Sequence, residues 1–113
     1  MTSKQRAYLR SLANSIDPIF QIGKAGLSEN LLKQLDDAIE ARELIKINVL
    51  ETSGKDVKSL GNEIANSINA VCVQTMGNKI TLYRARKKNP IILSDFSWHF
   101  LKLVVSYVLS MGQ

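Results

Sequence analysis

The stretch that most constrains this chain is Gly23-Lys24-Ala25-Gly26, which lies between a short apolar run and a segment with helical periodicity. The preceding run, residues 18–22, predicts a strand, because Ile and Phe favour extended structure and Pro suits the start of a strand. The helical pattern begins just after Ser28. Glycine has no Cβ, so both glycines allow positive φ and let a ligand approach the backbone closely. The sequence therefore predicts a strand, a glycine turn and a helix in succession.

Two features make this turn a candidate site for phosphate. A helix N-terminus carries a partial positive charge, and Lys24 adds a cation inside the turn itself. A GxxG loop that clamps a nucleic-acid backbone is the device of KH-type RNA-binding modules. The alternative is a turn that needs glycine only for its geometry, because GxxG is a common string. The motif alone leaves both interpretations open.

Size and charge indicate one small domain with an anionic partner. The chain has 113 residues, 45% hydrophobic and 22% charged, which is typical of an ordinary globular domain. Its net charge of +5 is unevenly spread: residues 1–28 carry a net +3, residues 29–63 a net −3, residues 64–88 a net +5, and the remainder zero. We expect the first helix, the glycine turn and the basic run over 84–88 to meet in the fold as a single cationic face.

The cysteine content and the N-terminus indicate the compartment. Cys72 is the single cysteine, so no intramolecular disulfide can form, and a reducing compartment fits. Residues 1–14 are polar and basic, without the apolar core of a signal peptide. We therefore expect a cytoplasmic protein.

Periodicity predicts the elements of an α/β fold. Apolar residues at helical spacing predict helices over 2–14, 29–42 and 56–69, with Thr2 and Gln5 at capping-box spacing and Ser28 as an N-cap. Alternation predicts a strand over 44–50, and residues 70–84 predict a hairpin that turns at Gly77-Asn78. The order α-β-α-β-α-β-β indicates a small four-stranded mixed sheet packed with about three helices, with right-handed parallel crossovers in its two β-α-β units.

The last quarter of the chain divides into a basic run and an apolar tail. Residues 84–88 form the densest positive charge, interpreted either as an RNA contact or as a solubilising terminus. The stretch from Phe96 to Met111 is mostly apolar, but it is shorter than the span of about 20 residues that a membrane requires, and it contains His99 and Lys102. We divide the chain into a domain over 1–88 and an atypical apolar tail over 89–113. The tail is expected to pack on the domain or to dock a partner protein, with peripheral membrane contact as the weaker alternative.

The chain shows no set of residues that would carry catalysis or hold a metal. His99 is the single histidine, Cys72 has no visible activating partner, and metal sites draw several Cys, His or carboxylate ligands. The glycine turn also lacks the spacing and the Ser or Thr of a Walker loop. We expect a protein without enzymatic activity, cofactor or metal.

Several linked motifs together resemble a known family. They are Lys4-Gln5-Arg6, Leu9-Arg10, the stretch from Pro18 to Leu27, Ala41-Arg42-Glu43-Leu44-Ile45-Lys46, Val73-Gln74-Thr75-Met76-Gly77-Asn78 and Leu82-Tyr83-Arg84. In this order, over about residues 2–84, they resemble the bacterial single-domain CRM family of YhbY-like RNA-binding proteins. The tail from about Asn89 departs from the pattern, because such proteins usually stop soon after the basic stretch.

The resemblance implies a fold, an activity and a site. The fold would be a compact α/β sandwich similar to the C-terminal domain of translation initiation factor three, and the activity would be RNA binding. Bacterial members associate with large-subunit ribosome precursors, so the expected partner is ribosomal RNA or the precursor of the large subunit, without DNA, and the expected state is a monomer. With few aromatics available for stacking, we expect recognition of RNA shape and backbone.

The predicted RNA-binding residues fall into two groups. The family's GxxG loop maps onto Gly23, Lys24, Ala25 and Gly26. The expected basic surface adds the cations of the first helix and of the run after the last strand, namely Lys4, Arg6, Arg10, Arg84, Arg86, Lys87 and Lys88. The alternative function is a protein-interaction module that docks through the apolar tail, with the charge serving solubility.

Overall fold

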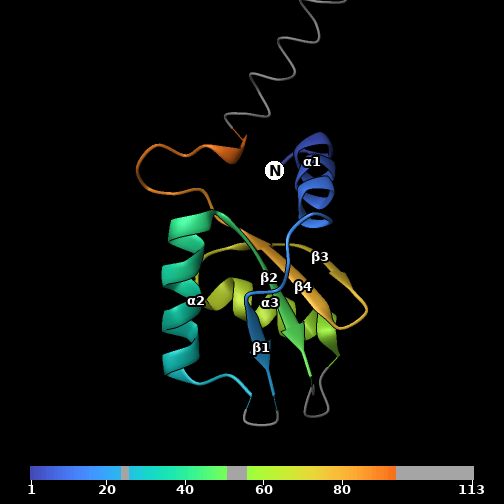
Figure 1. Cartoon of the computed structure of the whole chain (residues 1–113), viewed down its shortest axis with the longest axis vertical. Coiled ribbons are helices and arrows are strands. Elements are labelled where there is room, and N and C mark those ends of the chain that lie inside the picture. Colours follow the sequence, from blue (N-terminus) through green and yellow to red (C-terminus); the bar gives the residue numbers. More distant parts are fainter. Residues whose placement is uncertain (24–25, 51–55, 94–113) are drawn as a thin grey trace, which may run out of the picture.

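The computed structural model describes residues 1–23, 26–50 and 56–93. Its seven elements follow the predicted order and nearly the predicted boundaries (Figure 1). They are α1 (Ser3–Ala13), β1 (Phe20–Ile22), α2 (Glu29–Arg42), β2 (Leu44–Val49), α3 (Val57–Ser67), β3 (Val71–Met76) and β4 (Lys79–Tyr83). The predicted α/β class, with three helices and a four-stranded mixed sheet, is therefore confirmed.

Short-range hydrogen bonds set the start of each helix. Thr2 and Gln5 form the predicted capping box, in which each side chain accepts the other residue's backbone N–H, at 3.0 and 3.1 Å. Ser28 caps α2 and Asp56 caps α3 through their side-chain oxygens. These oxygens satisfy amides that have no partner within the helix. The helix starts are thus encoded by the residues next to them.

The strand order in the sheet is β1-β2-β4-β3. β1 runs parallel to β2, while β4 is antiparallel to both β2 and β3. It follows that β3 runs parallel to β2 although β4 lies between them. Both β-α-β units therefore join parallel strands, as predicted, but the second skips the position that β4 fills. The register along β3 shifts between Cys72 and Gln74.

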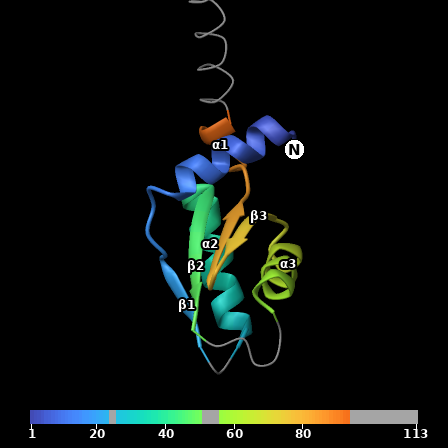
Figure 2. The same cartoon turned by 90° about the vertical axis from the view of Figure 1, so that its right-hand side faces the viewer.

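Alternation along β2 separates the two faces of the sheet. Ile45, Ile47 and Val49 pack with α2 and α3 in the larger core cluster. Leu44 lies on the opposite face, in a second cluster that contains Leu9 of α1. We call this second face the α1 face. Figure 2 shows α1 lying across one end of the sheet, so it covers only part of that face.

Packing continues beyond the predicted domain boundary after Lys88. Ile92 and Leu93 pack against the cluster that joins α1 to the sheet. The rest of the predicted tail, from residue 94 onward, lies outside the described residues. Within the described ranges, no helix has both the length and the apolarity needed to span a bilayer.

Candidate nucleic-acid interface

The two glycines of the turn after β1 stand in different situations. The Gly26 amide donates a hydrogen bond to the Gly23 carbonyl at 3.0 Å, the spacing of a β-turn. Gly26 has φ +71°, a conformation that other residues adopt only with strain. Gly23 has no positive φ, and a Cβ placed on it would meet no atom within 4 Å. The turn geometry therefore explains glycine at position 26 but not at position 23, where the backbone stays open to a ligand.

The start of α2 adds little to this site. The Ser28 hydroxyl accepts the Leu31 amide at 3.0 Å, and Glu29 places a carboxylate in the first turn. Both features reduce the ability of this helix end to attract an anion. The turn itself, rather than the helix N-terminus, is therefore the candidate phosphate contact. The other two residues of the motif, Lys24 and Ala25, lie outside the described residues.

The glycine turn and the basic run lie at opposite ends of β2. At one end, the Leu50 amide donates to the carbonyl of Ile22, the residue before the turn, at 2.8 Å. At the other end, the Arg84 amide donates to the Glu43 carbonyl at 2.9 Å. The six residues of β2, at about 3.3 Å each, separate these ends by about 20 Å. In Figure 1 the turn lies at the bottom, and α1 and the basic run lie at the top.

The predicted single cationic face does not form. Both views place α1 at the end of the molecule that carries the basic run, away from the glycine turn (Figures 1 and 2). The prediction that these three segments converge is wrong for a topological reason. The turn follows the C-terminal end of β1, which is parallel to β2, whereas the basic run follows β4, which is antiparallel to β2.

Arg84 is held inside the protein by α2 and the end of α3. Its Nη1 donates to the Asp36 carboxylate and, at 2.7 Å, to the Ile68 carbonyl. Its Nη2 donates to the Asp36 carbonyl at 3.1 Å and to Glu40 Oε1 at 3.2 Å. These bonds use four of the five N–H donors of the guanidinium, and only 18% of the side chain is exposed. The geometry favours a structural role for Arg84 over the predicted RNA contact.

Glu43 organises the segment that follows Arg84. It is fully buried, and its carboxylate accepts the backbone N–H groups of Arg86 at 3.2 Å, Ile91 at 2.8 Å and Ile92 at 3.2 Å. Glu40 accepts the Lys87 amide at 2.9 Å in the same way. The sequence analysis missed both roles. The available signal was the opposite net charge of residues 29–63 and 64–88.

The seven predicted cations divide into internal and exposed groups. Arg6 donates to the Cys72 and Val73 carbonyls at 3.0 and 2.9 Å, which ties α1 to the register shift in β3. The Arg86 Nε lies 3.9 Å from the buried Glu43 carboxylate. Arg6, Arg84 and Arg86 are partly buried and contact the rest of the protein in this way. The other four are exposed at the α1 end of the molecule: Lys4, Arg10, Lys87 and Lys88.

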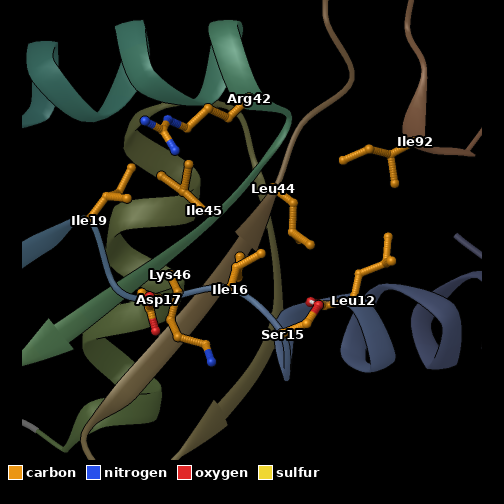
Figure 3. A pocket seen from close by; sticks show the side chains of 10 residues that line it. All are labelled: Leu12, Ser15, Ile16, Asp17, Ile19, Arg42, Leu44, Ile45, Lys46 and Ile92. Atoms are coloured by element: carbon orange, nitrogen blue, oxygen red, sulfur yellow. Dashed lines mark hydrogen bonds between the residues drawn. The ribbon is translucent and has the colours of Figure 1, made fainter.

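A hollow of about 480 Å³ separates α1 from the start of β2 (Figure 3). Its apolar side chains are Leu12, Ile16, Ile19, Leu44, Ile45 and Ile92, and its polar ones are Ser15, Asp17, Arg42 and Lys46. Figure 3 shows Leu12, Ile16, Leu44 and Ile92 pointing toward one another. The lining offers an apolar surface with a single carboxylate rather than a set of catalytic groups. In the described part of the chain, no group of three or more His, Cys, Asp or Glu side chains could hold a metal.

Cys72 is a half-buried thiol on the side of the sheet that faces α3. Burial raises the pKa of the thiol above its ordinary value, although the charges of Arg6 and Lys58 partly oppose the shift. A thiol with a raised pKa is a poor nucleophile at neutral pH.

Comparison with known sequences finds relatives over most of the chain. Residues 1–84 match the domain family described as "CRS1 / YhbY (CRM) domain". A Bacillus subtilis protein named "Probable RNA-binding protein YqeI" is 43% identical over 89 residues, which cover 79% of this chain and 93% of the relative. A Haemophilus influenzae protein named "RNA-binding protein" is 31% identical over 93 residues, which cover 82% of this chain and 94% of the relative.

A solved structure supports the same relationship. The solution structure of SAV1595 from Staphylococcus aureus, described as a candidate RNA-binding protein, has a TM-score of 0.70 and 49% sequence identity with this chain. The match covers 81% of this chain and 96% of that one. From the fold and the family match over residues 1–84, this chain belongs to the CRS1/YhbY (CRM) domain family.

Proposed function

We propose that this protein binds RNA and that the turn at Gly23 and Gly26 contacts the sugar-phosphate backbone. The observation that carries the proposal is Gly23. The fold does not require glycine there, yet the backbone is open, and Lys24 follows directly. Phosphate groups bind well where backbone amides and a cation meet without obstruction by a Cβ. The names of the bacterial relatives supply RNA as the phosphate-bearing ligand.

The exposed cations at the α1 end would provide a second region of contact. Lys4, Arg10, Lys87 and Lys88 attract phosphate without regard to base sequence. Because this region and the glycine turn are about 20 Å apart, the RNA must extend along the molecule to reach both. Arg84 is left out of the contact set, because its guanidinium is already hydrogen-bonded within the protein.

A charge placed at Gly23 tests the turn. Because a Cβ fits there, Gly23→Asp should leave the unfolding midpoint unchanged and should weaken RNA binding roughly tenfold, since a carboxylate would then face phosphate. Asn66→Asp, an exposed position on α3, is the matched control for one added negative charge. Fluorescence anisotropy with a labelled RNA measures both affinities. Equal affinity of the two variants would exclude the turn as a contact.

For the biological role, we propose binding to ribosomal RNA during assembly of the large ribosomal subunit. The protein would act in the cytoplasm as a monomer and would catalyse no reaction. Support comes from family membership together with the resemblance to bacterial single-domain CRM proteins. Crosslinking the protein to RNA in cells, followed by sequencing, should recover large-subunit ribosomal RNA above its share of total cellular RNA. Recovery of mainly messenger or transfer RNA would contradict this role.

A further inference from the structure

The α1 face has a polar half that no helix among the described residues covers. Cross-strand register places Lys46 opposite Thr81 and Thr81 opposite Gln74 in one row. The next row places Asn48 opposite Lys79 and Lys79 opposite Met76. The row that α1 does cover, which includes Leu44 and Tyr83, is apolar instead. We call these six residues the open half-sheet: Lys46, Asn48, Gln74, Met76, Lys79 and Thr81.

This surface is hollowed and carries positive charge. A cavity of about 200 Å³ lies between Asn14, which ends α1, and the turn that joins β3 to β4. Lys46 and Lys79 line it, and no carboxylate does. Asp17 and Lys46 both line the neighbouring hollow, in which Asp17 is the single carboxylate (Figure 3). The hollow is therefore complementary to an anionic ligand.

Three polar groups of the open half-sheet lack partners among the described residues. No hydrogen bond or ion pair engages the ammonium groups of Lys46 and Lys79. The Asn48 Oδ1 is buried without a partner. Buried polar groups in folded proteins are nearly always hydrogen-bonded. Unpaired groups beside two cations indicate a surface that gains its partners from a ligand.

The open half-sheet also lies between the two proposed RNA contacts. Asn48 precedes Val49, which pairs with Ile22 just before the glycine turn. At the other side, Asn14 ends α1, the helix that carries exposed cations. A strand of RNA that reached from the turn to α1 would cross Lys79 and then Lys46. The open half-sheet therefore bridges the gap of about 20 Å between the two basic regions.

We infer that the open half-sheet binds a single-stranded segment of RNA that runs from the glycine turn to α1. This inference rests on the proposed RNA-binding function. Lys46 and Lys79 contact phosphates, while Asn48 and Gln74 hydrogen-bond to base edges or ribose hydroxyls. The cavity between Asn14 and the β3–β4 turn holds an unpaired base, whose edge is free, rather than a base within an RNA duplex.

Charge removal on opposite faces of the sheet tests the inference. The double variant Lys46→Ala with Lys79→Ala should bind a single-stranded RNA of about ten nucleotides roughly tenfold more weakly than the unchanged protein. The matched control is Lys33→Ala with Lys58→Ala, which removes two exposed cations from α2 and α3 on the other face. The control should change affinity by about twofold or less. For a blunt RNA duplex with the same number of phosphates, the Lys46/Lys79 double variant should lose less affinity than it loses for the single strand.

A second measurement does not depend on charge. Gln74→Leu keeps nearly the same side-chain size and removes the partly exposed amide, so single-strand affinity should fall about threefold with no change in salt dependence. In NMR titrations of the unchanged protein with the single strand, the amides of Lys46, Asn48 and Thr81 should shift. Full single-strand affinity in the Lys46/Lys79 variant, or an equal loss for the duplex, would overturn the inference. In that case a loss of affinity in Gly23→Asp would still support the proposed RNA-binding function. If the unchanged protein bound neither RNA, the proposed function itself would be rejected.

Discussion

At the scale of single residues, Glu43 combines a positive backbone φ with a fully buried carboxylate. It ends α2 with φ +66°, which costs roughly 1–2 kcal/mol in a residue with a Cβ. Its buried carboxylate accepts three backbone N–H groups from the segment after β4. These charge-assisted hydrogen bonds offset the strain. One side chain thereby anchors both the end of a helix and a distant stretch of chain.

Glu43→Gln tests this anchor. The amide keeps the shape of the side chain but turns an N–H₂ donor toward backbone donors, so the free energy of unfolding should fall by about 1–3 kcal/mol. Urea unfolding followed by circular dichroism measures the change. Glu40→Gln is the control, because Glu40 is 36% exposed and accepts a single backbone amide. A loss no greater than that of the control would show that the buried carboxylate is not needed.

Asp56 gives a pH dependence at the same scale. Hydrogen bonds from the Ser59 side chain, and then from its backbone amide, lower the pKa of Asp56 below 3.8 in the folded protein. The unfolded state therefore binds more protons in acid, so this cap stabilises the fold above about pH 4 and is lost as the pH falls through the folded pKa. Asp56→Asn keeps a capping oxygen without the titration. Its melting temperature should fall less between about pH 4 and pH 2 than that of the unchanged protein. An equal fall in the melting temperatures of the variant and the unchanged protein over this pH range would contradict the prediction.

At the scale of elements, α3 lies unusually close to the sheet. A Cβ on Gly61 would lie 3.1 Å from the Cys72 Sγ and 3.3 Å from the Cγ2 atoms of Thr75 and Ile80. Two of these neighbours are β-branched strand residues with restricted χ1, so they cannot easily move aside. Glycine within a helix costs about 1 kcal/mol relative to alanine, and this close approach explains why it is kept.

Gly61→Val should therefore destabilise the fold by roughly 1–3 kcal/mol through overpacking. Asn62→Val, the next and exposed position on the same helix, measures the cost of valine in the helix alone. Thermal unfolding of both variants separates the two effects. Gly61→Val as stable as the control would mean that α3 can shift outward at little cost.

At the scale of the whole molecule, the cations are divided between structure and surface. Arg84 joins β4 to α2 and α3, whereas Lys87 and Lys88 remain exposed at the α1 end. If the proposed RNA neutralises about five cations, log affinity should fall with log salt at a slope of roughly −3.5 to −4.5. Lys87→Ala with Lys88→Ala should make that slope shallower by about 1.5.

Arg84→Lys should lower stability and leave the slope unchanged, because the Arg84 guanidinium faces carboxylates of its own chain. A shallower slope for Arg84→Lys would return that residue to the contact set.

Local signals in the sequence were enough to determine the elements of this protein and the order in which they occur. The range predicted for the second helix, 29–42, is the range observed for α2, because apolar spacing and the Ser28 cap act within a few residues. The glycine turn and the capping box are local in the same sense.

The tertiary structure alone decided which cations are exposed and which regions of the surface lie together. Arg84 meets Asp36 and Glu40 across 48 and 44 residues of chain, and no short-range pattern announces such a pair. The antiparallel placement of β4 between β2 and β3 sends the basic run to the end of the sheet opposite the glycine turn. The physical reason is that strand pairing and ion pairs between distant residues are long-range interactions, whose geometry exists only once the chain has folded.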